Sequence, residues 1–210
     1  MREKIANHLL EIGAVHLQPT NPFTWTSGIK SPIYCDNRLT LSYPHVRKDI
    51  ITGFVKLLEG IEVDVIAGTA TAGIPHAALL ADALDLPMVY VRGSAKGHGK
   101  QNQIEGKIEK GQKVVLVEDL ISTGGSVIQA AEALKASGAD VVAVIAIFTY
   151  EFQKANDALK EANLPTHILT SYSTLLNVAK EKGTITAEQV QRLNEWRKDP
   201  SSQSWMIEQV

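Results

Sequence analysis

The chain has 210 residues, and its 21 lysines and arginines against 23 aspartates and glutamates leave a formal net charge of −2. This length suits one domain with small additions, and the charge balance excludes the global basic field that nucleic-acid binding needs. Cys35 is the only cysteine, which excludes an intramolecular disulfide and a cysteine-rich metal cluster and suits a reducing compartment.

The N-terminal residues predict a helix followed by a hairpin-like segment. Ile5, Leu9 and Ile12 recur at helical spacing up to Gly13, so we expect an amphipathic helix over 2–13. This segment mixes charged and apolar residues, unlike a signal peptide, and no stretch of about 18 apolar residues follows, so we expect a cytoplasmic protein. Turn-forming pairs break up residues 23–38. Together these elements form a small N-terminal hood, about 1–45.

From residue 46 the pattern becomes regular and predicts alternating helices and strands. We expect helices at 46–59, 75–84 and 125–137, and strands at 63–68, 87–91, 114–117 and 141–148. Short β-branched runs that alternate with helices indicate a Rossmann-like α/β core with a parallel sheet covered on both faces, over about 46–170. Ligands of such sheets bind at the carboxyl ends of the strands.

The C-terminal part predicts one more strand, at 166–170, and then a helical segment over about 171–210. Thr186 and Gln189 fit a capping box ahead of a helix, which Pro200 ends. Because no linker or repeat interrupts the chain, we expect one domain that spans residues 1–210.

The stretch VVLVEDLISTGGS, residues 114–126, carries the strongest sign of chemistry. A Ser-Thr-Gly-Gly turn ahead of a helix leaves backbone N–H groups unpaired, and the hydroxyls of Ser122, Thr123 and Ser126 add donors, so the turn predicts a phosphate site. Glu118 and Asp119 stand before it and would repel a bare phosphate, so they must face hydroxyl groups or a cation. A sugar phosphate satisfies both requirements.

Two further loops follow predicted strands. GTATAGIP, residues 68–75, lacks the lysine and hydroxyl residue of a P-loop and the glycine pattern of dinucleotide binding. It predicts a tight turn that either approaches an anion or simply joins a strand to a helix. RGSAKGHGKQNQIEG, residues 92–106, is long for such a connection. It is either a solvated surface loop or a cationic lid over a polyphosphate, with charge from Arg92, Lys96 and His98.

These features resemble the type I phosphoribosyltransferases, whose signature is a hydrophobic strand, two acids and a small Thr-Gly-Gly loop. VVLVEDLISTGGS matches that signature over its whole length. FTWTSGIKSPIYCDNR, residues 23–38, looks like the hood of the members that use orotate, and RGSAKGHG looks like their catalytic lid. The resemblance extends from residue 5 to about residue 196.

The resemblance implies a phosphoribosyltransferase fold and an activity of pyrimidine biosynthesis. The phosphoribosyl group of 5-phosphoribosyl 1-diphosphate would pass to orotate, giving orotidine 5'-phosphate and diphosphate, with Mg²⁺ carried by the donor's diphosphate and not bound directly by the protein. The enzyme would be a homodimer with shared active sites, and neither nucleic acid nor membrane would be a partner.

The resemblance also implies roles for particular residues. The catalytic residues would be Lys96, Arg92, His98 and Asp119, and Ser122 would contact orotate together with Lys30, the nearest hood cation. The donor would be bound by Arg92, Lys96, His98, Glu118, Asp119, Leu120, Ile121, Ser122, Thr123, Gly124, Gly125 and Ser126. The chain departs from relatives that carry cations at four positions, where it has Thr26, Ala72, Gly93 and Tyr150.

Two other functions stay open on the sequence. One is a purine phosphoribosyltransferase, which shares the donor loop but has a different base pocket. The other is a regulator that senses phosphoribosyl diphosphate and binds nucleic acid, which would need a basic face or an added module. The tryptophans Trp25, Trp196 and Trp205 are interpreted as packing residues.

Overall fold

The computed structural model describes residues 1–25, 28–93 and 103–206. A six-stranded sheet forms the centre, in the order β10-β9-β8-β5-β6-β7. All neighbours in it are parallel except β6 and β7, which are antiparallel. The strands are β5 (Val65–Thr69), β6 (Met88–Val91), β7 (Ile104–Glu105), β8 (Lys113–Ile121), β9 (Asp140–Thr149) and β10 (Thr166–Ser171). The predicted α/β class with a mostly parallel sheet is confirmed.

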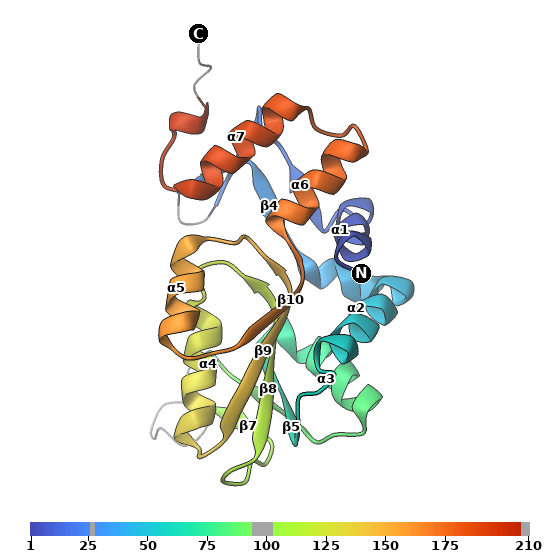
Figure 1. The fold of residues 1–210 in the computed structure, drawn as a ribbon, viewed down its shortest axis with the longest axis vertical. Coiled ribbons are helices and arrows are strands. Elements are labelled where there is room, and N and C mark those ends of the chain that lie inside the picture. The colour runs from blue at the N-terminus through green and yellow to red at the C-terminus, as the bar shows by residue number, and fades with distance from the viewer. Residues whose placement is uncertain (26–27, 94–102, 207–210) are drawn as a thin grey trace.

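Helices cover both faces of this sheet (Figure 1). The helices are α1 (Arg2–Glu11), α2 (Pro44–Leu57), α3 (Gly73–Leu84), α4 (Gly125–Ala136), α5 (Gln153–Glu161), α6 (Tyr172–Glu181) and α7 (Ala187–Lys198). Two short 3-10 helices are η1 (Asn37–Ser42) and η2 (Ser204–Met206). Side chains of α4 and α5 pack in one buried cluster, whereas those of α1, α2, α3 and α6 pack in a second cluster on the other face. Strands buried from both sides read as continuous apolar runs, as in β8 and β9.

The N-terminal hood and the C-terminal helices, which are distant in sequence, form one lobe. The strands of the hood are β1 (Val15–Leu17), β2 (Phe23–Thr24), β3 (Lys30–Ser31) and β4 (Ile33–Cys35), which pair as β1 with β4 and β2 with β3. In Figure 1 they lie beside α6 and α7, so the C-terminal helices share the upper lobe with the N-terminal strands. The capping box of α7 forms as predicted, with Thr186 and Gln189 bonded reciprocally.

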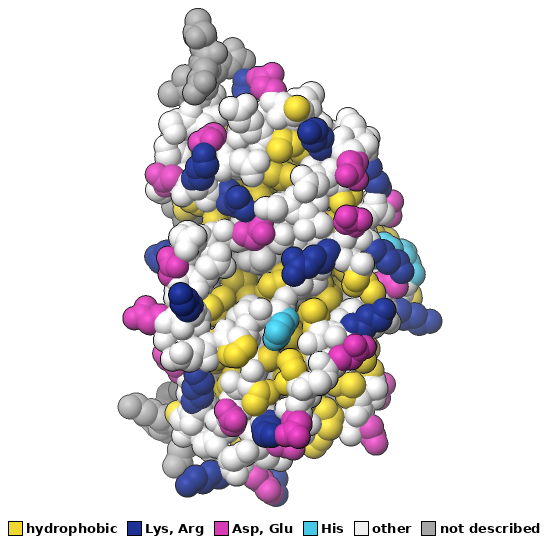
Figure 2. All heavy atoms as spheres, in the orientation of Figure 1, with side chains coloured by type: hydrophobic (Ala, Val, Ile, Leu, Met, Phe, Trp, Pro, Cys, Tyr) yellow, Lys and Arg dark blue, Asp and Glu magenta, His cyan; other side chains and the backbone are white. Residues whose placement is uncertain are grey.

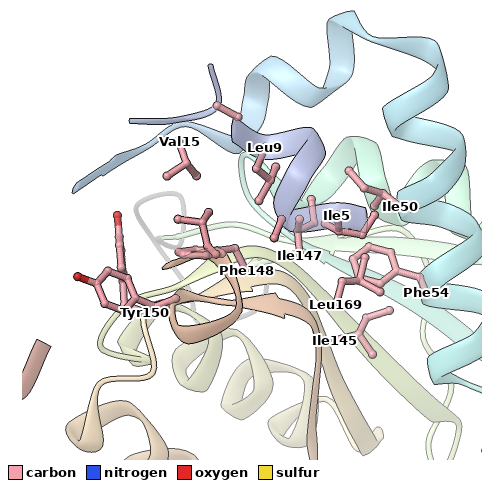
Figure 3. Packing of buried hydrophobic residues seen from close by; sticks show 14 of the residues in the cluster. Ile5, Leu9, Val15, Ile50, Phe54, Ile145, Ile147, Phe148, Tyr150 and Leu169 are labelled. Atoms are coloured by element: carbon pink, nitrogen blue, oxygen red, sulfur yellow. The ribbon is translucent and has the colours of Figure 1, made fainter. Parts of the chain in front are cut away.

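Residues of α1 join the hood to the core. Ile5 and Leu9 are fully buried. Figure 3 shows them between the sheet residues Ile147 and Phe148 and the α2 residues Ile50 and Phe54. Burying side chains of this size contributes about 1.5–3 kcal/mol each. The hood is therefore fixed to the carboxyl-end half of the sheet, where a ligand of a parallel sheet is expected.

Three details differ from the predictions. The strand predicted at 114–117 extends to Ile121 as β8, because its pairing with β9 continues through Ile121 and Thr149. Two elements of the core were not predicted, the helix α5 and the two-residue strand β7, of which β7 is too short to show a pattern. No helix among the described residues is long and apolar enough to cross a membrane.

Candidate active site

The strand order reverses between β5 and β8. The chain runs from β5 outward through β6 and β7, and β8 then returns to the other side of β5, followed by β9 and β10. The connections that leave β5 and β8 therefore diverge to opposite faces and open a crevice at the carboxyl ends of these two strands. The loops at 68–75 and 118–126 both begin there.

Glu118 and Asp119 lie near the carboxyl end of strand β8, and not in a loop as the sequence suggested. Glu118 is 5% exposed, and its carboxylate accepts from the backbone N–H of Asp119 at 2.9 Å and from Ser126 Oγ at 3.4 Å. Burial, followed by the neighbouring Asp119 carboxylate, raises the pKa of Glu118 to about 8. At neutral pH this favours the protonated carboxyl group, and a nearby cation would favour the ionised form.

The turn after β8 has the geometry expected of a phosphate site. Gly124 has a φ of 83° and caps the N-terminus of α4, a left-handed conformation that glycine adopts without strain. Ser122 is half-buried, and Thr123, Gly125 and Ser126 are exposed. These residues are thus accessible at the N-terminus of a twelve-residue helix, where an anion is favoured.

The loop after β5 packs directly against β8. A Cβ atom at Gly73 would lie 2.4 Å from the carbonyl oxygen of Val117, so only glycine allows this approach. Helix α3 begins at Gly73, two residues before the predicted start at Pro75, and the peptide bond between Ala70 and Thr71 is cis. Ala72, one of the four departures from cationic relatives, precedes this helix as its N-cap.

Arg92 stands just beyond β6 at the base of the long loop. Its backbone N–H donates to the Gln103 carbonyl at 2.8 Å, and the Gln103 amide donates back to the Arg92 carbonyl at 3.1 Å. Its guanidinium forms an ion pair with Glu105 at 3.0 Å. The two ends of the loop are therefore closed at Arg92 and Gln103. The predicted lid residues Lys96 and His98 lie outside the described residues, as does Thr26 in the hood.

A pocket of about 440 Å³ lies between the hood and the end of β8. Its lining residues from the hood are Phe23, Thr24, Trp25, Tyr34 and Cys35, and those from the core are Leu120, Ser122 and Tyr150. Ser122 and Leu120 belong to both the pocket wall and the stretch that leads into the phosphate turn. The pocket and the turn are therefore adjacent parts of one site.

Aromatic rings form the inner wall of this pocket. The ring centroids of Trp25 and Tyr150 are 5.7 Å apart, and Tyr150 is stacked on Phe152 at 5.3 Å. Figure 3 shows the Tyr150 side chain beyond Phe148 at the edge of the buried cluster. Burial raises the pKa of the Tyr150 hydroxyl well above its usual value, so the ring is neutral.

Sequence reasoning missed most of the pocket. Trp25 packs against the buried cluster, as interpreted, and its indole N–H donates to the Ile33 carbonyl at 3.3 Å, but it also lines the pocket, which was not predicted. Trp196 and Trp205 are buried, as expected for packing residues. The available signal was the group of aromatic side chains in the short hood hairpin, Phe23, Trp25 and Tyr34, which no local pattern assigned to one cavity.

Lys30 is not among the residues that line this pocket, but it contacts one of them. Its ammonium group donates to the hydroxyl of Thr24 at 2.7 Å, and Thr24 lines the pocket. The described part of the chain therefore brings Lys30, Ser122 and the two β8 acids to one region, while Arg92 lies two strands away on the far side of β5.

The described residues contain no group of three or more histidine, cysteine or acidic side chains that could hold a metal ion. What they offer at the strand end is the carboxylate pair of Glu118 and Asp119. Mg²⁺ commonly binds through one or two carboxylates together with substrate phosphates and water. The residues present thus fit a magnesium ion that arrives with a phosphorylated substrate, and do not form a closed protein site.

This combination of a strand-order reversal, two acids and a hydroxyl-rich turn defines a site for a sugar phosphate on an α/β sheet. The family described as the phosphoribosyl transferase domain matches residues 43–172, which include both loops. The chain belongs to the phosphoribosyltransferase family, and it is an enzyme of the pentosyltransferase class.

Relatives place the chain within that family. Orotate phosphoribosyltransferase of Halalkalibacterium halodurans is 62% identical over 210 residues, which cover 99% of this chain and 100% of the relative. Among solved structures, orotate phosphoribosyltransferase from Aeropyrum pernix has a TM-score of 0.73 at 29% identity and covers 87% of this chain and 99% of its own. Leishmania donovani UMP synthase has a TM-score of 0.79 at 28% identity, and this chain spans 42% of its length. The chain thus groups with the orotate phosphoribosyltransferases.

Proposed function

We propose that this protein transfers the phosphoribosyl group of 5-phosphoribosyl 1-diphosphate to orotate, giving orotidine 5'-phosphate and diphosphate, in a reaction that depends on Mg²⁺ and serves pyrimidine biosynthesis. The observation that carries the proposal is the adjacency of the two halves of the site. Leu120 and Ser122 line the pocket and also lead into the phosphate turn, so a planar ring in the pocket lies next to a sugar phosphate in the turn.

The donor is assigned to the end of β8. Glu118 and Asp119 would accept hydrogen bonds from the two ribose hydroxyls, and the turn from Leu120 to Ser126 would surround the 5-phosphate with backbone N–H groups and hydroxyls. The buried position of Glu118 and the open N-terminus of α4 support this division of roles, since one suits neutral hydroxyls and the other suits an anion.

Orotate is assigned to the pocket. A flat ring of this kind suits a cavity walled by Trp25, Tyr34 and Tyr150, because aromatic faces stack on planar groups. The carboxylate of orotate needs a cation or strong donors at the pocket edge, and Lys30, bonded to Thr24, is a described cation at that position. Ser122 supplies a hydroxyl from the opposite wall.

The diphosphate is assigned to the lid, with Arg92, Lys96 and His98 as its cations. Arg92 is the member of this set that the structure describes, and its pairing with Glu105 leaves the guanidinium half-buried beside the base of the loop. Closure of a lid excludes water, which competes with orotate for the same carbon of the donor.

In the proposed reaction the bond between the anomeric carbon and the diphosphate oxygen breaks, and both electrons leave with diphosphate. A ring nitrogen of orotate donates the electron pair of the new bond to that carbon and loses its N–H proton, which passes to the departing diphosphate or to water. The sugar has oxocarbenium character between these events, so positioning and charge stabilisation dominate catalysis. Asp119 holds the ribose while charge develops, and no side chain acts as a covalent nucleophile. Mg²⁺, held by the donor with the β8 carboxylates near, would supply charge neutralisation for the diphosphate.

A homodimer with shared active sites is part of the proposal. Several of the large apolar side chains that are exposed among the described residues, Leu39, Tyr43 and Leu79, come from η1, the start of α2, and α3. Helix α2 contacts both η1 and α3, which makes these elements a candidate surface for self-association. The proposal places the enzyme in the cytoplasm, in keeping with its one free cysteine.

Two alternatives are less well supported. A purine phosphoribosyltransferase shares the donor site, but the match to a named orotate enzyme covers 99% of this chain and so includes the hood that walls the pocket. A nucleic-acid-binding regulator would need a basic face, whereas the face in Figure 2 shows acidic and basic side chains interspersed.

The loss of orotate absorbance tests the proposal. Protein, orotate, phosphoribosyl diphosphate and Mg²⁺ are mixed, each component is omitted in turn, and adenine, guanine and hypoxanthine replace orotate in a parallel panel. Loss that requires all four components supports the proposal. Conversion of a purine base without conversion of orotate would establish the first alternative instead, and retention of DNA or RNA at moderate salt would favour the second.

A further inference from the structure

Asn37 lies where the hood meets the core. It is the first residue of η1 and is 1% exposed. Its side-chain N–H donates to the backbone carbonyl of Asp119 at 2.8 Å, and its side-chain oxygen accepts from the Cys35 thiol at 3.4 Å. One buried amide therefore touches both the strand end that carries the ribose carboxylate and a wall of the pocket.

The bond to Asp119 comes where β8 extends beyond its neighbour. Strand β5 pairs with β8 only as far as Val117, and Glu118 and Asp119 project past that point. This hydrogen bond is partly buried, and a carbonyl that loses its partner away from water costs up to about 1–3 kcal/mol. The Asn37 amide is this partner at Asp119 and fixes the main chain that carries its carboxylate.

The core holds Asn37 in turn. The Thr40 hydroxyl donates to the Asn37 carbonyl at 2.6 Å and lies 3.4 Å from Nε2 of His76 on α3. Because the hydroxyl proton is directed at Asn37, the hydrogen of this second contact belongs to Nε2 of His76. Burial lowers the pKa of His76 to about 4, so the ring is neutral with that tautomer. Asn37 thus has fixed contacts with β4, η1 and β8.

We propose that Asn37 is a positioning residue, which sets the distance between the orotate pocket and the ribose carboxylate of Asp119. This inference rests on the proposed function, since it assigns the pocket and the strand end to two substrates that must react with each other. A displacement of about 1 Å between reacting groups can lower a rate by about a hundredfold. A side chain that bonds both halves of the site limits such displacement.

A double-mutant cycle tests the proposal. Asn37→Ala and Asn37→Ser, which lack the amide donor, are prepared alone and with Asp119→Asn, and kcat and both KM values are measured with orotate. We expect each single substitution at Asn37 to lower kcat/KM by about ten- to a hundredfold, and by less than about threefold when Asp119 is already replaced. Equal losses in both backgrounds would overturn the proposal, because a general structural defect does not depend on Asp119.

Binding of phosphoribosyl diphosphate without a base is the second readout. Calorimetry measures this binding for the same single and double variants. The matched control is Asn156→Ala on the exposed face of α5. The proposal expects weaker donor binding only while Asp119 is present, with the control unchanged. This separates two failures: a parent enzyme that binds the donor but leaves orotate unconverted refutes the proposed reaction, whereas additive losses of donor binding refute the role of Asn37. Melting temperatures show that each variant compared is folded.

Discussion

Ser126 on the first turn of α4 lies with its hydroxyl oxygen 3.4 Å from the carboxylate of Glu118 on β8. A residue on the strand before the phosphate turn is thus bonded to the last residue of that turn. This contact closes the turn between a strand and a helix, and it places a hydroxyl donor against a carboxyl group that is almost fully buried. The Glu118 carboxyl group therefore affects both the stability of the fold and the proposed chemistry of the site.

Glu118→Gln is expected to stabilise the protein at neutral and alkaline pH. The pKa of Glu118 is raised to about 8 in the folded protein, first by burial, from its ordinary value of 4.5. Between these values the unfolded chain loses the proton while the folded protein keeps it, so stability falls as pH rises from about 4.5 to about 8. Glutamine keeps the shape without this ionisation.

Melting temperatures at pH 4.5, 6.5 and 8 provide the measurement. The variant should match the parent at the lowest pH and exceed it increasingly above, by about 2–4 °C for each kcal/mol regained. Glu132→Gln, at an exposed position of α4, is the control. A difference between variant and parent that does not change with pH would remove burial of the charge as the cause. The same variant should bind the donor less tightly.

Gly73→Ala is expected to destabilise the fold around the crevice. The new Cβ would stand 2.4 Å from the Val117 carbonyl oxygen, and neither backbone can move without disturbing the contact between α3 and β8. A clash of this kind costs about 1–3 kcal/mol or more. Urea unfolding measures the loss, and Gly125→Ala, where the Cβ meets nothing within 4 Å, is the matched change. Equal stability of the two variants would refute the close approach.

The sequence predicted residues of one half of the candidate site and not of the other. Glu118, Asp119 and the Ser-Thr-Gly-Gly turn are consecutive, so a strand pattern with its following loop was enough to predict them. Trp25, Cys35 and Tyr150 meet only because the hood folds over the sheet, and no local periodicity encodes a contact between segments more than a hundred residues apart. For the same reason Asn37 showed no signal, since its partner Asp119 is 82 positions away. The strand boundary at β8 was misplaced because acidic residues weaken an apolar run while β9 continues the pairing.

Lys30→Met is expected to weaken orotate binding. The methionine side chain keeps most of the length and removes the charge, so a charge-assisted hydrogen bond worth about 1.5–3 kcal/mol is lost. The KM for orotate should rise by about ten- to a hundredfold, with little change in the KM for phosphoribosyl diphosphate. Lys48→Met, at an exposed position on α2, controls for the loss of a lysine. If both KM values rise together, Lys30 has a general effect on the hood and is not a specific orotate contact.

Lys96→Ala is expected to lower kcat strongly with a smaller effect on donor binding. The charge on diphosphate grows only as its bond to the sugar breaks, so a lid cation stabilises the transition state more than the bound donor. Steady-state kinetics and donor calorimetry together make the distinction. An unchanged kcat would remove Lys96 from the mechanism.

His76→Gln is expected to weaken the pH dependence of the unfolding free energy below about pH 6.5. Burial, with a smaller contribution from Arg47, lowers the pKa of His76 from 6.5 to about 4. The unfolded chain takes up a proton as pH falls through about 6.5 while the folded protein does not, so this stability is complete above pH 6.5 and is lost towards pH 4. Glutamine preserves an N–H donor for Thr40 and has no such titration.

Glu118 acts in the opposite direction over part of the same range, so the quantity to compare is the difference in unfolding free energy between variant and parent at each pH. That difference should favour the parent most above pH 6.5 and shift towards the variant as pH falls from 6.5 to 4. His167→Gln on β10, where the side chain is half-buried, provides the control. A difference that stays constant over this range would mean that His76 takes up its proton at the same pH in the folded and unfolded chain, and would remove the neutral tautomer that holds Thr40 and, through it, Asn37.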